Sequence, residues 1–181
     1  MSIIERETRE TRIRVMVESD PAITTIDTSV PFLDHMLHTL ARYGGIGLAV
    51  AARGDLRHHL IEDVAISIGK AVSAYAPPSC ARFGDRTIPM DDALVHCALD
   101  LGGRAYYEGP LPSNIYDHWM RSFADNAGAT LHVRVIRGHD RHHIVEACFK
   151  ALGLALRDAL RRGDTDAVFS TKGAAVIDTA Q

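Results

Sequence analysis

The sequence predicts an α+β fold built from two duplicated halves, each reading β-β-α-β-α with a trailing short strand. The main observation is a ten-residue phrase, Arg53 to Glu62, that returns 84 residues later as Arg137 to Glu146 with six identical positions. Around each copy, strand-like and helix-like spacings of apolar residues follow one another in the same order. Because four amphipathic helices and two small sheets need a common core, we expect a four-helix layer sandwiched between the sheets.

Each half is expected to begin with a strand and a helix. Residues 10–18 alternate polar and apolar side chains, and residues 94–102 repeat this alternation in the second half. A helix is predicted at about 31–43, because Pro31 suits a first turn and two glycines follow the apolar stripe. Its counterpart is expected at about 115–127.

A second strand and helix complete each half. The strands are predicted at 48–53 and 131–137, and each ends in Arg-Gly just before a His-His pair. The helices are predicted at about 58–76 and 142–161, where apolar residues recur at helical spacing. We therefore interpret residues 1–181 as a single domain of two pseudo-repeats, about 6–90 and 91–175.

Composition narrows the class of partner. With 181 residues and 46% hydrophobic content the chain is long enough for one ordinary core. The net charge of -3 and the dispersed Lys and Arg residues predict neither a nucleic-acid nor a membrane partner, so a small molecule is favoured. Three widely spaced cysteines, together with the lack of an apolar leader or an 18-residue apolar stretch, predict a cytoplasmic protein.

The repeated phrase has the spacing of metal ligands. In a helix, the first His and the Glu of each copy lie four residues apart and the second His lies three from the Glu, so we expect all three on one edge. A single HHxxE is more often a surface feature, but its duplication favours metal binding. The predicted ligands from the two copies are His58, His59, Glu62, His142, His143 and Glu146.

Two complete four-ligand shells need two more imidazoles. His35 stands among apolar residues of the first helix, and His132 points away from the apolar face of its strand, although either alone could equally be a hydrogen-bonded core histidine. His38, His96, His118 and His139 lack a repeat partner and are interpreted as ordinary polar residues. Shells dominated by imidazole favour Mn, Fe, Co or Zn over Mg or Ca.

Several further segments carry a family resemblance. They are Arg6-x-Thr8-x-Glu10-Thr11-x-Ile13, Pro31-Phe32-Leu33-Asp34-His35-Met36-Leu37, His58-His59-x-x-Glu62-Asp63, Arg82-Phe83-Gly84 with Pro89-Met90-Asp91, Leu99-Asp100-Leu101-x-Gly103-Arg104, Leu131-His132, His142-His143-x-x-Glu146-Ala147-x-Phe149-Lys150-Ala151 and Ser170-Thr171-Lys172-Gly173. Together they run from residue 6 to 173 and are far more specific than any one of them. The chain resembles imidazoleglycerol-phosphate dehydratase, an enzyme of histidine biosynthesis.

The resemblance implies a site and an assembly. It implies two Mn²⁺ ions per active site, held by residues matching His35, His58, His59, Glu62, His132, His142, His143 and Glu146. It implies substrate contacts from Glu10, Arg82, Arg104, Lys150, Ser170 and Lys172, with the cations and Ser170 holding the phosphate. It also implies a homo-oligomer, a shell of 24 subunits built from trimers with active sites between chains.

The implied reaction is the dehydration of imidazole glycerol phosphate to imidazole acetol phosphate. No carbonyl activates the hydrogen that is lost, so a metal-bound imidazolate is expected to expel the neighbouring hydroxyl. A carboxylate then removes the side-chain proton. Glu10 is the first candidate for this acid–base work, and Glu62 and Glu146 are weaker ones because metal ligation occupies their lone pairs.

Some positions depart from the family pattern. Tyr43 stands where a His is usual, Leu60 replaces a Thr, Asp140 replaces an Asn, Phe169 replaces a Pro, and the stretch 54–57 is shortened. No predicted metal ligand is lost, so the departures bear on substrate fit. Two alternatives stay open: a divergent paralogue that acts on another azole phosphate, and a non-catalytic shell protein assembled by metal.

Overall fold

The structure is a computed structural model that describes residues 1–163 and 168–170. The first half comprises β1 (Ser2–Glu7), β2 (Thr11–Glu18), a 3-10 turn (Pro21–Ile23), β3 (Thr25–Asp27), α1 (Pro31–Gly44), β4 (Gly47–Gly54) and α2 (Arg57–Tyr75). The second half comprises β5 (Phe83–Met90), β6 (Ala93–Leu101), β7 (Tyr106–Glu108), α3 (Asn114–Ala127), β8 (Ala129–Arg137) and α4 (Arg141–Ala159). The four predicted helices are therefore all present.

Each half forms one four-stranded sheet of the same topology. The strand orders are β1-β2-β4-β3 and β5-β6-β8-β7, with antiparallel pairing except for the short strands β3 and β7, which run parallel to β4 and β8. The predicted duplicated α+β class is confirmed. Two details differ: the short strand precedes the first helix of each half instead of trailing it, and the halves meet at residues 76–82, because residues 83–90 join the second sheet.

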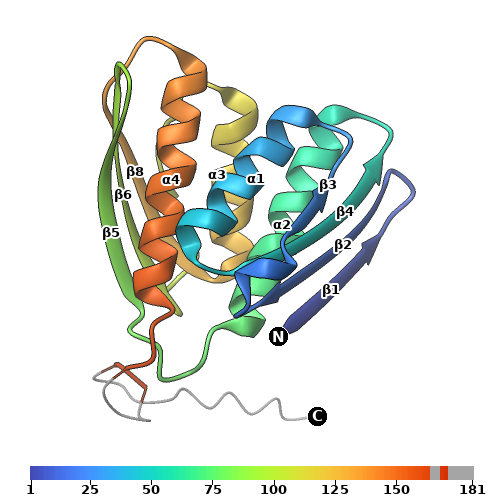
Figure 1. The fold of residues 1–181 in the computed structure, drawn as a ribbon, viewed down its shortest axis with the longest axis horizontal. Coiled ribbons are helices and arrows are strands. Elements are labelled where there is room, and N and C mark those ends of the chain that lie inside the picture. Colours follow the sequence, from blue (N-terminus) through green and yellow to red (C-terminus); the bar gives the residue numbers. More distant parts are fainter. Residues whose placement is uncertain (164–167, 171–181) are drawn as a thin grey trace.

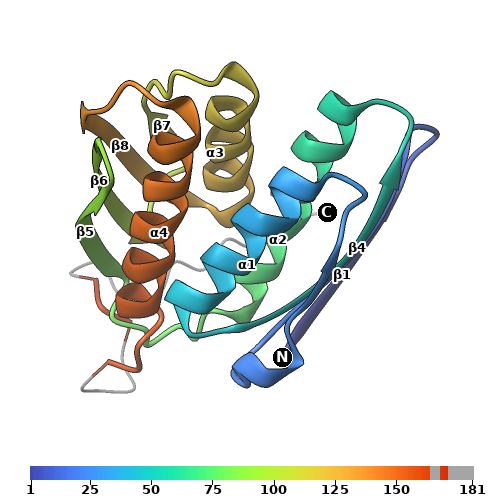
Figure 2. The same cartoon turned by 45° about the horizontal axis from the view of Figure 1, so that its top comes forward.

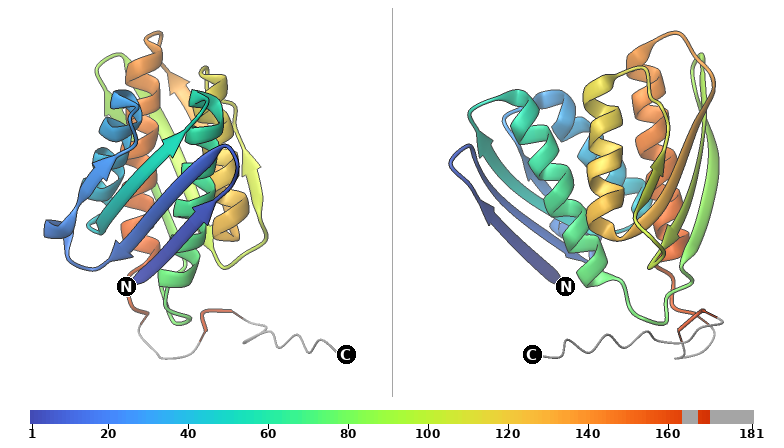
Figure 3. Two further views of the ribbon diagram at one scale, coloured as in Figure 1. Left: turned by 90° about the vertical axis from the view of Figure 1, so that its right-hand side faces the viewer. Right: turned by 180° about the vertical axis from the view of Figure 1, so that it is seen from behind.

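The helices lie between the two sheets, as Figures 2 and 3 show. Helix α1 packs against α4 and α2 packs against α3, so the helix contacts cross from one half to the other. Aromatic side chains fill the centre: the Trp119 ring lies 4.7 Å from the Phe149 ring and stacks on Phe123 at 5.5 Å, and all three are fully buried. The two halves therefore share one core.

Two glycines permit this close helix packing. A Cβ atom on Gly69 would lie 2.6 Å from the carbonyl oxygen of Phe123 on α3, and one on Gly153 would lie 2.9 Å from that of Leu40 on α1. Gly69 and Gly153 are equivalent positions of α2 and α4. Only a residue without a side chain lets the backbones approach this closely.

The two ends of the folded molecule carry different segments (Figure 1). All four helices begin at the end where the β1–β2 and β5–β6 turns also lie. The loop into β5 and the connection from β6 to β7 lie at the opposite end, near both termini of the described chain. Among the described residues, no helix is long and apolar enough to cross a membrane.

Candidate active site

One group of possible metal ligands joins α1 to α4. Glu146 lies with its Oε2 atom 3.2 Å from Nε2 of His142, one helical turn before it, and 3.4 Å from Nε2 of His35 on α1. One ligand atom from each of the three residues falls within 4.8 Å of the others. Two imidazoles and one carboxylate converge here because the i,i+4 pair faces the neighbouring helix.

A second group joins α2 to α3 in the same manner. Glu62 lies with Oε2 3.7 Å from Nε2 of His58 and with Oε1 3.5 Å from Nε2 of His118. The rings of His58 and His118 are 5.3 Å apart, and the three ligand atoms again lie within 4.8 Å of one another. Each group therefore takes a His–Glu pair from one half and a His from the other.

His118 is the residue that sequence reasoning missed. It was interpreted as lacking a repeat partner, yet α1 and α3 begin at Pro31 and Asn114, so its equivalent is His35. The preceding residues behave alike: Asp34 accepts a hydrogen bond from the N–H of Thr28 at 2.9 Å, and Asp117 accepts one from the N–H of Leu111 at 2.8 Å. Equivalent positions of α1 and α3 are 83 residues apart (114 − 31), whereas the repeated phrase recurs after 84 residues. A comparison at the 84-residue spacing therefore does not pair His118 with His35.

His132 lies elsewhere. It stands on β8, exposed, with its ring 5.6 Å from that of Tyr106 on the neighbouring strand β7. It belongs to neither ligand group among the described residues. The alternation of β8 turns Leu131 and Val133 into the core and so turns His132 to the outer face of the sheet.

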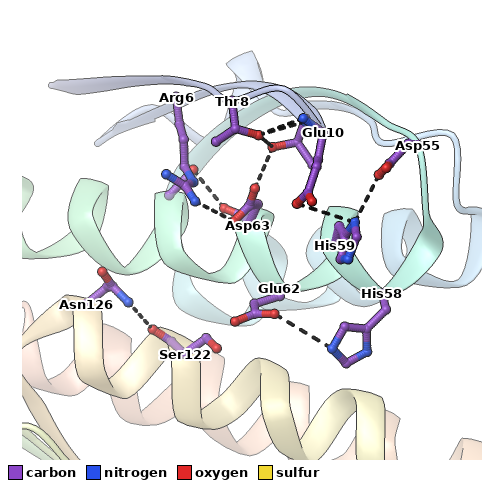
Figure 4. Close-up of polar contacts among 12 residues, drawn as sticks. Arg6, Thr8, Glu10, Asp55, His58, His59, Glu62, Asp63, Ser122 and Asn126 are labelled. Atoms are coloured by element: carbon purple, nitrogen blue, oxygen red, sulfur yellow. Dashed lines mark hydrogen bonds and ion pairs between the residues drawn. The ribbon is translucent and has the colours of Figure 1, made fainter.

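The second His of each phrase faces a different way from the first. Figure 4 shows His58 and Glu62 pointing toward α3, whereas His59 points toward the strands. His59 Nδ1 lies 3.0 Å from Asp55 and 3.5 Å from Glu10. The expectation that all three side chains share one edge is therefore wrong, because consecutive residues of a helix lie about 100° apart around its axis.

His143 repeats this arrangement in the second half. Its Nδ1 lies 2.7 Å from Asp92, and its Nε2 lies 3.3 Å from Asp91 in the β5–β6 turn. The hydrogen bond with Asp92 raises the pKa of His143, just as the hydrogen bond with Asp55 raises the pKa of His59. Each second histidine is thus paired with carboxylates that belong to neither ligand group.

The two groups differ in their surroundings. Glu146 is buried and forms an ion pair with Nζ of Lys150 at 2.9 Å. The side chain of Glu62 is a third exposed, and Ile66 stands at the position equivalent to Lys150. Burial alone would raise the pKa of Glu146, but hydrogen bonds from Lys150 and His35 hold it below its usual value. Lys150 therefore places a cation beside the first group only.

Three predicted substrate contacts lie at the opposite end of the molecule from the two ligand groups, namely Arg82, Arg104 and Ser170. Arg82 directly precedes β5 and forms a two-point ion pair with Asp100, at 2.5 and 3.0 Å, while its Nη1 donates to the carbonyl of Phe169 at 3.2 Å. Arg104 is exposed in the β6–β7 connection, and Ser170 follows Phe169. Lys172 lies outside the described residues.

Some departures from the family pattern have local explanations. Asp140 caps α4 by accepting a hydrogen bond from the N–H of His142 at 2.7 Å, a role that Asn also fills. Leu60 is 2% exposed and belongs to the core. The Tyr43 ring lies 5.8 Å from Lys150 Nζ, which fits a cation–π contact. The shortened stretch supplies Asp55, which holds His59.

The donor sets fit a transition-metal ion. Each group offers two imidazole nitrogens and one carboxylate oxygen, and Mn, Fe, Co and Zn all accept this mixture. Three protein ligands per group leave coordination positions for other ligands, as in catalytic metal sites.

A profile of the family described as imidazoleglycerol-phosphate dehydratase matches residues 28–156, which contain both ligand groups. The chain belongs to this family. It is 43% identical to the imidazoleglycerol-phosphate dehydratase of Desulforudis audaxviator over 94% of this chain and 95% of that protein. It is 39% identical to the dehydratase of Archaeoglobus fulgidus over 92% and 95%, respectively. It is also 41% identical to a histidine biosynthesis bifunctional protein of Stenotrophomonas maltophilia, over 96% of this chain and 52% of that protein.

Solved structures of imidazoleglycerol-phosphate dehydratases have the same fold. The Pyrococcus furiosus structure superposes with a TM-score of 0.85 at 36% identity, covering 95% of this chain and all of that one. The Staphylococcus aureus structure gives 0.79 at 31% identity, covering 90% and 99%. The chain is thus a dehydratase of histidine biosynthesis, and the expectation of an enzyme is confirmed, which disfavours the non-catalytic shell.

Proposed function

We propose that the chain catalyses the metal-dependent dehydration of imidazole glycerol phosphate to imidazole acetol phosphate in L-histidine biosynthesis, with two Mn²⁺ ions per active site. The observation that carries this proposal is the pair of equivalent ligand groups, His35–His142–Glu146 and His58–Glu62–His118. Two such groups match a substrate whose imidazole ring has two nitrogens. When bound there, divalent ions supply Lewis-acid polarisation of the ring.

Glu10 is the proposed acid–base group. Its side chain is half exposed, and its one partner among the described residues is His59 at 3.5 Å, so its oxygens stay available for a proton of the substrate. Loss of the hydroxyl and of the proton on the adjacent carbon gives an enol, which then becomes the ketone. Glu62 and Glu146 are less suited to this step, because each already contacts two imidazoles.

We also propose that active sites are completed between chains of a homo-oligomer built from trimers. Each ligand group has only three ligands among the described residues, while His59 and His143 belong to neither group and contact other carboxylates. The proposed phosphate contacts Arg82 and Arg104 lie at the end opposite the start of the helices. A neighbouring copy would bring an outward-facing histidine and a set of cations to each group.

A turnover assay tests this function. Metal-stripped protein is incubated with imidazole glycerol phosphate before and after Mn²⁺ is returned, and formation of the ketone is followed. We expect turnover only after Mn²⁺ returns. Equal turnover in EDTA would exclude the metal-dependent reaction, and failure to act on this substrate while acting on another azole phosphate would favour the paralogue.

A further inference from the structure

We propose that Asp63 is a positioning residue that holds the β1–β2 turn and thereby fixes Glu10 beside His59. The inference rests on the proposed function, in which Glu10 is the acid–base group. Asp63 directly follows Glu62 on α2 but points to the other side of the helix, toward the strands (Figure 4). It is a carboxylate with only 8% of its surface exposed, and the reaction as described does not use it.

The carboxylate of Asp63 contacts the chain on both sides of the turn. Its Oδ1 accepts a hydrogen bond from Nη2 of Arg6 at 2.8 Å, and its Oδ2 accepts one from the hydroxyl of Thr11. Arg6 precedes the turn on β1, and Thr11, 4% exposed, follows it on β2. A buried carboxylate needs such partners, so the two strands are fastened to α2 at one point.

Within the turn, the backbone of Glu10 is held on both sides. Its N–H donates to Oγ1 of Thr8 at 3.1 Å, and its carbonyl accepts from the N–H of Asp55 at 3.0 Å. Thr8 Oγ1 also accepts from the N–H of Thr11 at 3.0 Å and lies 3.2 Å from the Thr11 hydroxyl. The network thus runs from Asp63 through Thr11 and Thr8 to the backbone of Glu10 and leaves its carboxylate free of backbone bonds among the described residues.

The second half provides an internal comparison. There Asp92 occupies the turn beside His143, but its carboxylate itself accepts from the N–H groups of His139 at 2.6 Å and Asp140 at 3.2 Å. Together with the 2.7 Å contact between its Oδ1 atom and Nδ1 of His143, these bonds occupy both oxygens of the Asp92 carboxylate. Ala147 stands at the position equivalent to Asp63. In the first half, the hydrogen bonds of the turn therefore go to the backbone of Glu10. In the second half, they go to the side-chain carboxylate of Asp92.

A double-mutant cycle tests whether Asp63 acts through Glu10. We expect Asp63→Asn to lower kcat roughly ten- to a hundredfold with little change in KM, as a displaced reacting group does. Because both changes act on the same step, Asp63→Asn should add little to the loss in a Glu10→Gln background. Losses that multiply in the double variant would overturn the proposal.

Thr11 supplies a second pair of variants should Asp63→Asn fold poorly. Thr11→Ser keeps the hydroxyl and should retain most of kcat, whereas Thr11→Val removes it and should lower kcat as Asp63→Asn does. Arg12→Gln is the matched control, since Arg12 is exposed on the same strand and pairs with Glu7 at the surface. Equal activity of the Ser and Val variants would contradict the positioning role.

Hydrogen–deuterium exchange gives a readout that does not depend on turnover. In Thr11→Val, amides of residues 8–11 should exchange faster, while amides of the β5–β6 turn should be unchanged. Unaltered exchange at residues 8–11 would overturn the proposal even if activity falls. If the wild-type enzyme does not act on imidazole glycerol phosphate, the proposed function fails, and the exchange result still decides whether Asp63 and Thr11 hold the turn.

Discussion

The Nε2 atom of His118 on α3 lies 3.5 Å from Oε1 of Glu62 on α2, and this contact links the two halves of the chain at a possible metal site. The equivalent contact joins His35 of the first half to Glu146 of the second. Each ligand group therefore depends on the packing of two helices from different halves. Metal binding and the association of the halves should accordingly support each other.

His118→Ala should weaken binding of one Mn²⁺ by roughly two to three decades in affinity, because one strong ligand of the group is lost. His38→Ala is the matched control, since that histidine is exposed on α1 and belongs to neither ligand group among the described residues. Calorimetric titration of metal-stripped protein would measure both. If His118→Ala kept both binding events at the affinity of the His38→Ala control, the placement of His118 as a ligand would be wrong.

Gly69→Ala and Gly153→Ala should each lower the free energy of unfolding by about 1–3 kcal/mol, because the new Cβ would overlap a carbonyl of the facing helix. Lys70→Ala, at an exposed position of α2, serves as the control and should change stability little. Urea unfolding at one protein concentration measures all three. Glycine variants as stable as the wild type would show that the helices can move apart freely.

Lys172→Ala should raise the KM for the phosphorylated substrate roughly ten- to a hundredfold, the usual effect of removing a charge-assisted contact of about 1.5–3 kcal/mol. Metal content should stay unchanged. Inorganic phosphate should inhibit the wild-type enzyme competitively and the variant much less. Wild-type kinetics with undiminished phosphate inhibition would remove Lys172 from the phosphate site.

Light scattering in Mn²⁺ and in EDTA tests the shared site. We expect a large symmetric particle in Mn²⁺, because each ligand group has three ligands within the chain and the proposed phosphate contacts lie at the other end. His59→Ala and His143→Ala should shift the particle toward smaller species. A monodisperse monomer under both conditions would contradict sites completed between chains.

Much of the fold could be predicted because the duplication repeats the hydrophobic spacing of each main strand and helix in the second half. Pro31 begins α1 as expected, and Gly45, in the left-handed region at φ 62°, ends it. The short strands β3 and β7 were not placed before the first helix of each half, because three residues are too few for an alternation to show. The junction was placed near residue 90, whereas residues 83–90 belong to the second half because they pair with β6, which is a long-range property.

The part of the site that depends on local spacing could be predicted from the sequence, and the part that depends on how elements pack together could not. The pairs His58–Glu62 and His142–Glu146 are local, so helical spacing alone indicates them. His118 depends on how α3 lies against α2, and His59 depends on which face of α2 meets the sheet; neither follows from spacing within one segment. The contacts of Asp63 with Arg6 and Thr11 likewise join elements more than 50 residues apart in the sequence.

The most direct test of the two-group metal site is a titration of metal-stripped enzyme with Mn²⁺ in which bound metal and turnover of imidazole glycerol phosphate are measured on the same samples. We predict that turnover rises until two Mn²⁺ ions are bound per chain and then stays constant, and that His118→Ala binds only one ion tightly and is inactive. Full turnover at one ion per chain, or turnover without metal, would contradict the two-group site.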